Sequence, residues 1–344
     1  MMKPFLILMT ASATFLMAEP PKESSSDQPP QAEKSAKDET WESPLRQSAL
    51  EVQLFLDKAG FGPGKLDGRW GSVTQAAFKQ WASTQDEDAK LENEKGELVK
   101  EKVAELGWEA PLTKSYTISE DDQKLIGKVP DEPKDQAKQE DLPYTSLAEL
   151  VAEKFHSDLD FLKEMNGLEN EDKLSVGDEI TVPNVATPFD LSKAISLGKE
   201  EDGEASENEE KISMTIKRSE NLVLVKRDGE LVHTFPISIG EAGNKTPAGD
   251  WETVVVKWMP VFRYDKQMLE EGKRSADAHV LPPGPNNPVG IVWMGLSADG
   301  IGLHGTPSPD KIGRTRSHGC IRLSNWDALR LGQLLTTGVP VTIE

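Results

Sequence analysis

The spacing of apolar residues changes along this 344-residue chain. Apolar side chains recur every three to four positions over residues 44–59 and 72–81, which predicts two helices joined by a turn rich in glycine. Similar spacing over residues 147–165 predicts a second pair of helices, followed by a short strand that stops at Pro183. The first half of the chain is therefore expected to be largely helical.

From Lys211 onward the apolar positions alternate instead, as they do in half-buried strands. Arg227-Asp228-Gly229-Glu230 has the composition of a hairpin turn between two such strands. A helix is expected near residues 325–335 and a final strand at 339–343. The last third of the chain therefore predicts a mostly β domain.

Polar and acidic stretches separate these parts and predict spacers, although residues 116–118 could form a strand inside one of them. The expected organisation is a signal peptide at 1–18, a disordered spacer at 19–43, a helical module at 44–84, an acidic linker at 85–141, a second module at 142–185, another acidic linker at 186–210 and a C-terminal domain at 211–344.

The N-terminus has one basic residue, Lys3, followed by an apolar run of about 14 residues, which is typical of a secretory signal. Cleavage is expected after Ala18 or near residues 11–13; the alternative is a short buried helix. An exported protein facing the periplasm or cell wall is predicted, with no integral membrane segment once the signal is removed.

Charge is unevenly distributed over the chain, whose net charge is −20. Residues 211–344 contain 16 basic and 14 acidic residues, giving +2, so the first 210 residues carry −22. Nucleic-acid binding requires clustered Lys and Arg, and this balance argues against it.

Cys320 is the only cysteine, so this chain has no internal disulfide. It ends the segment Ser317-His318-Gly319-Cys320, which is rich in nearby basic residues and glycine. A thiol becomes a strong nucleophile when an imidazole accepts its proton, and either His318 or His304 could do so. The alternatives are a buried, inert Cys320 and a His318 that only shapes the loop. Five scattered histidines and one cysteine form no credible zinc site.

These residues carry a resemblance to a known family. His304-Gly305-Thr306, Ser317-His318-Gly319-Cys320-Ile321-Arg322-Leu323 and the upstream Thr246-Pro247-x-Gly249 resemble the signature of the YkuD-type L,D-transpeptidase catalytic domain. The resemblance covers about residues 211–344 and implies a β-sandwich type of fold.

The resemblance also implies roles for individual residues. Cys320 would be the nucleophile, and His304 the general base and acid, oriented by the backbone carbonyl of Gly305. Ser317, His318 and Gly319 would shape the site, with the amides of Gly319 and Cys320 near the oxyanion. Arg322 would hold the substrate or the loop.

The substrate that the resemblance implies is a tetrapeptide stem of peptidoglycan, and the implied reaction requires no metal or organic cofactor. Attack on the bond between the diamino acid and D-Ala would release D-Ala and leave a thioester, which an amine of a second stem or of a wall-linked protein would resolve. Two alternatives stay open: water could resolve the same thioester, as in a carboxypeptidase or amidase, or the chain could be a non-catalytic cell-wall-binding scaffold.

Two further resemblances lie nearer the N-terminus. Leu66-Asp67-Gly68-x-Trp70-Gly71 within residues 44–84 resembles the peptidoglycan-binding-like helical domain. Residues 142–185 resemble a βααβ LysM module, most clearly in Leu174-x-x-Gly177-Asp178-x-Ile180. At its start, Tyr144-Thr145-Ser146-Leu147 replaces the usual Gly-Asp-Thr-Leu, so glycan binding and a purely structural role both remain open.

Overall fold

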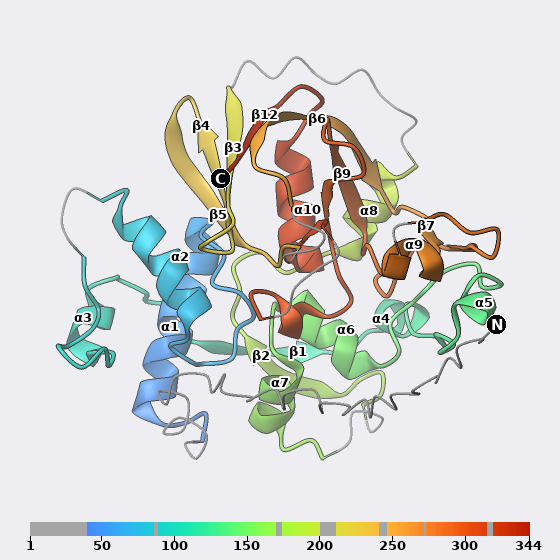
Figure 1. Cartoon of the computed structure of the whole chain (residues 1–344). Coiled ribbons are helices and arrows are strands. Elements are labelled where there is room, and N and C mark those ends of the chain that lie inside the picture. The colour runs from blue at the N-terminus through green and yellow to red at the C-terminus, as the bar shows by residue number, and fades with distance from the viewer. Residues whose placement is uncertain are drawn as a thin grey trace, which may run out of the picture. The chain divides into compact units, whose positions relative to one another are not determined.

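An eight-stranded sheet dominates the C-terminal part of the chain (Figure 1). The strand order is β11-β10-β9-β6-β12-β3-β4-β5. The strands are β3 (Ile212–Lys217), β4 (Leu222–Arg227), β5 (Glu230–Pro236), β6 (Gly249–Trp258), β9 (Val292–Leu296), β10 (Gly302–His304), β11 (Ile321–Arg322) and β12 (Pro340–Ile343). The structure is a computed structural model that describes residues 40–85, 89–169, 174–199, 211–240, 246–271, 273–314 and 319–344.

The two halves of this sheet share one hydrophobic core. Ile216 and Phe235 from one half belong to the same buried cluster as Met294 and Leu303 from the other. The sandwich expected for this domain is therefore built from one continuous sheet, in which β12 pairs with both β3 and β6.

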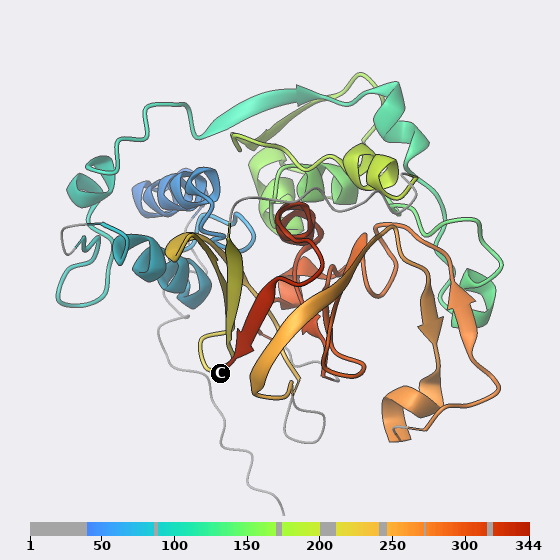
Figure 2. The ribbon, with the colours of Figure 1, turned by 90° about the horizontal axis from the view of Figure 1, so that it is seen from above.

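Helix α10 (Asn325–Leu334) lies between that core and a second one. Its Ala328 and Leu331 belong to the core of the sheet, whereas Trp326 and Leu329 belong to a cluster formed mainly by residues before Lys211. Figure 2 shows α10 beside the sheet, with green helices on its other side. Because both faces of α10 are apolar, the helix packs against the core of the sheet on one side and against the residues before Lys211 on the other.

The N-terminal helices begin and end where the sequence predicts. Helix α1 (Pro44–Ala59) is capped by the Ser43 side chain and ends at Gly60, whose φ of 86° is left-handed. Helix α2 (Ser72–Ala82) follows, and the short α3 (Lys100–Ala104) also packs against α1. A small core of Val52, Leu56 and Phe78 unites them.

The structure differs from the prediction of a linker over 85–141. Strand β1 (Thr113–Thr117) lies there and pairs antiparallel with the distant β2 (Glu179–Pro183), Thr113 lying opposite Pro183 and Thr117 opposite Glu179. Between these strands are α4 (Glu120–Lys124), α5 (Pro133–Gln136), α6 (Leu147–Lys154) and α7 (Leu159–Asn166). The sequence predicted at most a possible strand at residues 116–118, because β1 is short and polar and its partner is distant.

The prediction of a linker over 186–210 also differs from the structure in part. Helix α8 (Leu191–Leu197) lies there, with Leu191 and Ala194 buried. A hairpin of β7 (Phe262–Tyr264) and β8 (His279–Leu281), the adjoining α9 (Lys266–Glu271) and a 3-10 turn at Pro309–Lys311 were not predicted either.

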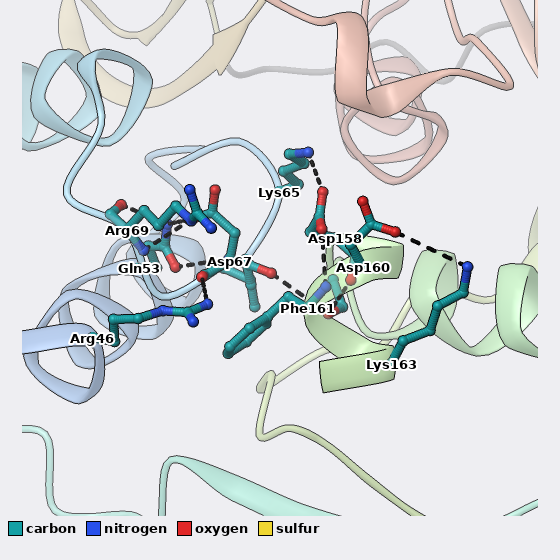
Figure 3. Close-up of polar contacts among 11 residues, drawn as sticks. Arg46, Gln53, Lys65, Asp67, Arg69, Asp158, Asp160, Phe161 and Lys163 are labelled. Carbon is teal, nitrogen blue, oxygen red and sulfur yellow. Dashed lines mark hydrogen bonds and ion pairs between the residues drawn. The ribbon is translucent and has the colours of Figure 1, made fainter. Parts of the chain in front are cut away.

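Polar contacts connect the helical module to α7. Arg46 donates to the carbonyl of Asp67 at 2.9 Å and forms an ion pair with Glu164 at 2.7 Å. Figure 3 shows Lys65 facing Asp158 at the start of α7, where the two side chains form an ion pair. Residues Glu39–Glu344 accordingly group into one compact unit.

The predicted signal peptide lies outside the described residues. Among the helices that the structure describes, none combines the length and the apolar character needed to span a bilayer.

Candidate active site

The parallel pairing of β10 with β11 places His304 opposite Arg322, two positions after Cys320. Leu303 is opposite Ile321, and His304 is opposite Arg322. Leu303 and Ile321 are fully buried in the core of the sheet. Because successive side chains in a strand point to opposite faces, His304 and Arg322 occupy the other face, and Cys320 lies two positions before Arg322 at the same edge.

The imidazole of His304 is fixed in orientation and tautomer. Its Nδ1 lies 2.6 Å from the carbonyl oxygen of Gly305. A carbonyl can only accept, so Nδ1 carries the proton, and in the neutral ring Nε2 is the basic nitrogen. The indole of Trp293, on the neighbouring β9, stacks on the ring with centroids 5.6 Å apart.

Burial lowers the pKa of His304 to about 4, and the nearby Arg322 guanidinium acts in the same direction. The hydrogen bond to Gly305 opposes this shift but does not outweigh it. His304 is therefore neutral at physiological pH and able to accept a proton at Nε2.

The thiol of Cys320 is held in its protonated form. Burial raises its pKa, whereas a main-chain hydrogen bond from Gly302 and the charge of Arg322 both lower it. Its Sγ lies 3.6 Å from the carbonyl oxygen of Gly300, within range for a thiol donor. A nucleophilic role for this sulfur would therefore need a base to accept its proton.

Arg322 is anchored by its backbone and carries the positive charge of the site. Its amide and carbonyl pair with those of Ser238, at 2.9 and 3.0 Å. Desolvation lowers the pKa of the guanidinium, while Cys320 acts in the opposite direction. A cation on this face favours any negative charge that develops near Cys320.

Gly319, directly before Cys320, adopts a backbone conformation that few other residues accept. Its φ is 121°, and its carbonyl accepts a hydrogen bond of 2.8 Å from the buried hydroxyl of Thr246. Glycine is needed here because a β-carbon would strain this φ.

Residues 211–343 match the YkuD family, described as the L,D-transpeptidase catalytic domain. They form a YkuD-type L,D-transpeptidase catalytic domain. The prediction of this family from the residues around His304 and Cys320 is thereby confirmed.

Known proteins are similar to this catalytic domain and to part of the chain before it. The YkuD protein of Bacillus licheniformis, named as an L,D-transpeptidase, is 27% identical over 195 residues, covering 57% of this chain and 92% of that protein. The ErfK/SrfK protein of Escherichia coli K12, also named as an L,D-transpeptidase, is 38% identical over 124 residues, covering 34% of this chain and 38% of that protein. A solved L,D-transpeptidase from Mycobacterium smegmatis is 21% identical with a TM-score of 0.33, covering 39% of this chain and 59% of that one. The present chain thus spans about six tenths of that solved chain.

The catalytic domain places most of the predicted site residues in one region. His304, Gly305, Gly319, Cys320 and Arg322 all lie on β10, β11 or the residues that flank them. Ser317 and His318 lie outside the described residues, so their expected contribution stays a prediction.

Three residues of the catalytic-domain site were not predicted. Trp293 stacks on His304, Ser238 pairs with Arg322, and Asn325 packs against Gly305. The alternation of β9 could have pointed to Trp293 as a neighbour of the next strand, but Ser238 and Asn325 give no signal in the sequence. Within the described ranges, no three His, Cys, Asp or Glu side chains converge as ligands for a metal ion.

Proposed function

We propose that this chain is a peptidoglycan L,D-transpeptidase that uses Cys320 as its nucleophile. The observation that carries the proposal is the β10–β11 pair, which places a histidine of fixed tautomer opposite Arg322, with the thiol of Cys320 two positions before Arg322. The match of residues 211–343 to the L,D-transpeptidase catalytic domain supports this reaction class.

In the proposed first step, Sγ of Cys320 attacks the carbonyl between the diamino acid and D-Ala of a tetrapeptide stem. The thiol proton passes to Nε2 of His304, because Nδ1 already donates to Gly305. The resting thiol and imidazole are both neutral, so the proton moves together with the attack rather than before it. The amides near Gly319 and Cys320 and the charge of Arg322 would stabilise the oxyanion.

Collapse of the intermediate breaks the peptide bond, and the imidazolium of His304 protonates the departing amine of D-Ala. The stem is then bound to Cys320 as a thioester. In the second step the amine of an acceptor stem attacks this thioester, His304 accepts a proton from that amine, and the thiol is regenerated. An amine of a wall-linked protein could take the same place, and hydrolysis by water is the competing outcome.

We also propose that the parts before Lys211 hold the enzyme on the cell wall, and that the whole chain acts outside the cytoplasm. A groove of about 540 Å³ beside α2 is lined by Trp70 and Phe78 together with the amides of Gln75 and Asn93. Aromatic faces next to amide groups suit the apolar and hydroxyl faces of a sugar ring. The alignment with the Bacillus licheniformis protein spans 195 residues, so it extends into the residues before Lys211.

The test is incubation of the purified protein with tetrapeptide muropeptides, followed by mass spectrometry. Cross-linked dimers with release of D-Ala are expected, and Cys320→Ala is expected to reduce turnover about 10³-fold or more. Binding of Cys320→Ala to isolated sacculi should remain, because the proposed wall-binding parts are unchanged.

Each contrary result has a distinct meaning. Tripeptide without dimers would assign the chain to the hydrolytic alternative. Full turnover by Cys320→Ala would disprove the thiol mechanism. If the wild type binds sacculi but shows no turnover, and if a thiol-reactive probe forms no covalent adduct with Cys320, the chain would be a non-catalytic wall-binding scaffold.

A further inference from the structure

The side chain of Asn325, at the start of α10, is fixed by two acceptors. Its Nδ2 donates to Oε1 of Glu153 at 2.9 Å and to the carbonyl of Pro285 at 3.2 Å. Both acceptors require the amide nitrogen, so they determine which way the side-chain amide faces. Glu153 belongs to α6 and therefore lies outside the catalytic domain.

This orientation directs Oδ1 of Asn325 at Gly305. A β-carbon added to Gly305 would lie 2.2 Å from this oxygen, and one added to Gly290 would lie at the same distance. Among the residues that the structure describes, Oδ1 finds no hydrogen-bond donor. Oδ1 of Asn325 is therefore packed tightly against Gly305 and limits where the backbone of Gly305 can lie.

Gly305 is the residue that orients the proposed base. Its carbonyl accepts from Nδ1 of His304, and its amide donates to the carbonyl of Val292 at 3.3 Å. Any shift of the Gly305 peptide would change the direction of its carbonyl and therefore the plane of the imidazole. A change of a fraction of an ångström at a proton-transfer group is enough to slow catalysis.

We propose that Glu153 of α6 is a positioning residue for His304, acting through Asn325 and Gly305. The effect on turnover rests on the proposed function, whereas the effect on the histidine ring does not. The segment before Lys211 would then do more than hold the enzyme on the wall, because it would also keep the base in its working orientation.

The chemistry of Glu153 suits this role. The side chain is 7% exposed, and its second oxygen is hydrogen-bonded to the hydroxyl of Tyr144. Desolvation raises the pKa of Glu153 to about 8, which keeps the carboxyl uncharged at neutral pH. Both bonds of Glu153 are accepted, one from Asn325 at Oε1 and one from the Tyr144 hydroxyl at Oε2. A glutamine keeps the acceptor for Asn325, and its amide nitrogen can donate to the Tyr144 hydroxyl instead.

The experiment compares Glu153→Leu with Glu153→Gln in the full chain. Glu153→Leu removes the acceptor for Asn325 at similar volume, and kcat is expected to fall about 10-fold with little change in KM. Glu153→Gln should restore kcat to within about twofold of the wild type, since it keeps the acceptor.

A second readout follows the ring itself. Proton–nitrogen NMR of histidine-labelled protein should show His304 with Nδ1 protonated in the wild type and in Glu153→Gln. In Glu153→Leu this signal should broaden or shift toward the other tautomer. Tyr144→Phe is the matched control, since it removes the other hydrogen bond of Glu153 without touching Asn325, and it should lower Tm while leaving kcat and the ring unchanged.

The outcomes separate the two proposals. An unchanged His304 signal and unchanged kcat in folded Glu153→Leu would overturn the positioning role, as would an equal loss of kcat in Tyr144→Phe. If the wild type shows no turnover at all, the proposed function fails, and the NMR comparison still decides the role of Glu153.

Discussion

At the scale of single residues, burial shifts the pKa of His304 and that of Cys320 in opposite directions but toward the same charge state. The pKa of His304 falls to about 4, and that of Cys320 rises, so both groups are neutral over a broad range around pH 7. An ion pair of thiolate and imidazolium would require the opposite shifts. At neutral pH the site therefore holds an uncharged thiol and an uncharged imidazole.

This charge state predicts the pH profile of turnover. Because His304 stays unprotonated down to about pH 4, kcat/KM should remain nearly constant from pH 7 to pH 5 and fall only around pH 4. The measurement is kcat/KM for tetrapeptide muropeptides between pH 4 and pH 9. An acidic limb with an apparent pKa near 6.5, the ordinary value for histidine, would contradict this account of His304.

The pH profile needs a control for unfolding, because the protein also loses stability in acid. The folded pKa of His304 lies below its unfolded value, so the unfolded chain binds the extra proton first and the native state loses stability as pH falls from about 6.5 to about 4. Circular dichroism at each pH separates this loss of structure from loss of the base.

At the scale of elements, the sequence predicted those with a strong local pattern. Helices α1 and α2 and most strands of the catalytic domain lie where apolar spacing placed them. For β1 the sequence predicted only a possible strand at residues 116–118 and not its partner, because its five residues are polar or half-buried and β2 is far along the chain. The motif predicts a role for His304 and Cys320, which stays a prediction. Nothing in the sequence pointed to Asn325 and Glu153, because a contact between α6 and α10 leaves no periodic signal.

One contact between elements gives a second prediction. The segment before β6 is joined to the segment before β11 by the hydroxyl of Thr246, which donates to the carbonyl of Gly319 at 2.8 Å. Thr246→Val keeps the shape but removes this bond, so the Gly319–Cys320 backbone should lose its alignment and kcat should fall about 10-fold. Steady-state kinetics on muropeptides provides the measurement.

Thr246→Ser is the matched variant, since it keeps the hydroxyl and loses only a methyl group. It should retain most of the wild-type kcat. If Thr246→Val and Thr246→Ser lose activity equally, the packing of the methyl group, rather than the hydrogen bond to Gly319, would be responsible.

At the scale of the whole molecule, the parts of the chain meet in a buried charged cluster. Asp57 of α1 accepts from both guanidinium nitrogens of Arg330 in α10, at 2.7 and 3.1 Å, and from Nδ1 of His156 at 3.0 Å. His156 also stacks on Trp326 of α10 with ring centroids 5.3 Å apart. The acidic front half therefore includes a carboxylate that holds the structure together, not only solvated spacers.

Asp57→Asn tests how much this cluster stabilises the protein. The substitution leaves the Arg330 charge buried without its partner, so the free energy of unfolding should fall by about 3 kcal/mol, measured by urea denaturation. Asp135→Asn is the matched control: Asp135 pairs with Lys138 at 2.6 Å, but both side chains are exposed, and no measurable change is expected.

The pH dependence of this loss has a definite sign. Interactions with His156 and Arg330 outweigh desolvation and hold the pKa of Asp57 far below its usual value, so its contribution to stability is present above about pH 3.8 and is lost on acidification below it. The wild type should therefore lose more stability between pH 5 and pH 3 than Asp57→Asn does, and the two unfolding curves should converge at low pH. If the two plots of unfolding free energy against pH were parallel, protonation of Asp57 would not be the cause of the acid-induced loss of stability. An unfolding transition that splits in two for Asp57→Asn alone would instead show that the cluster is what makes α1 and α10 unfold as one unit.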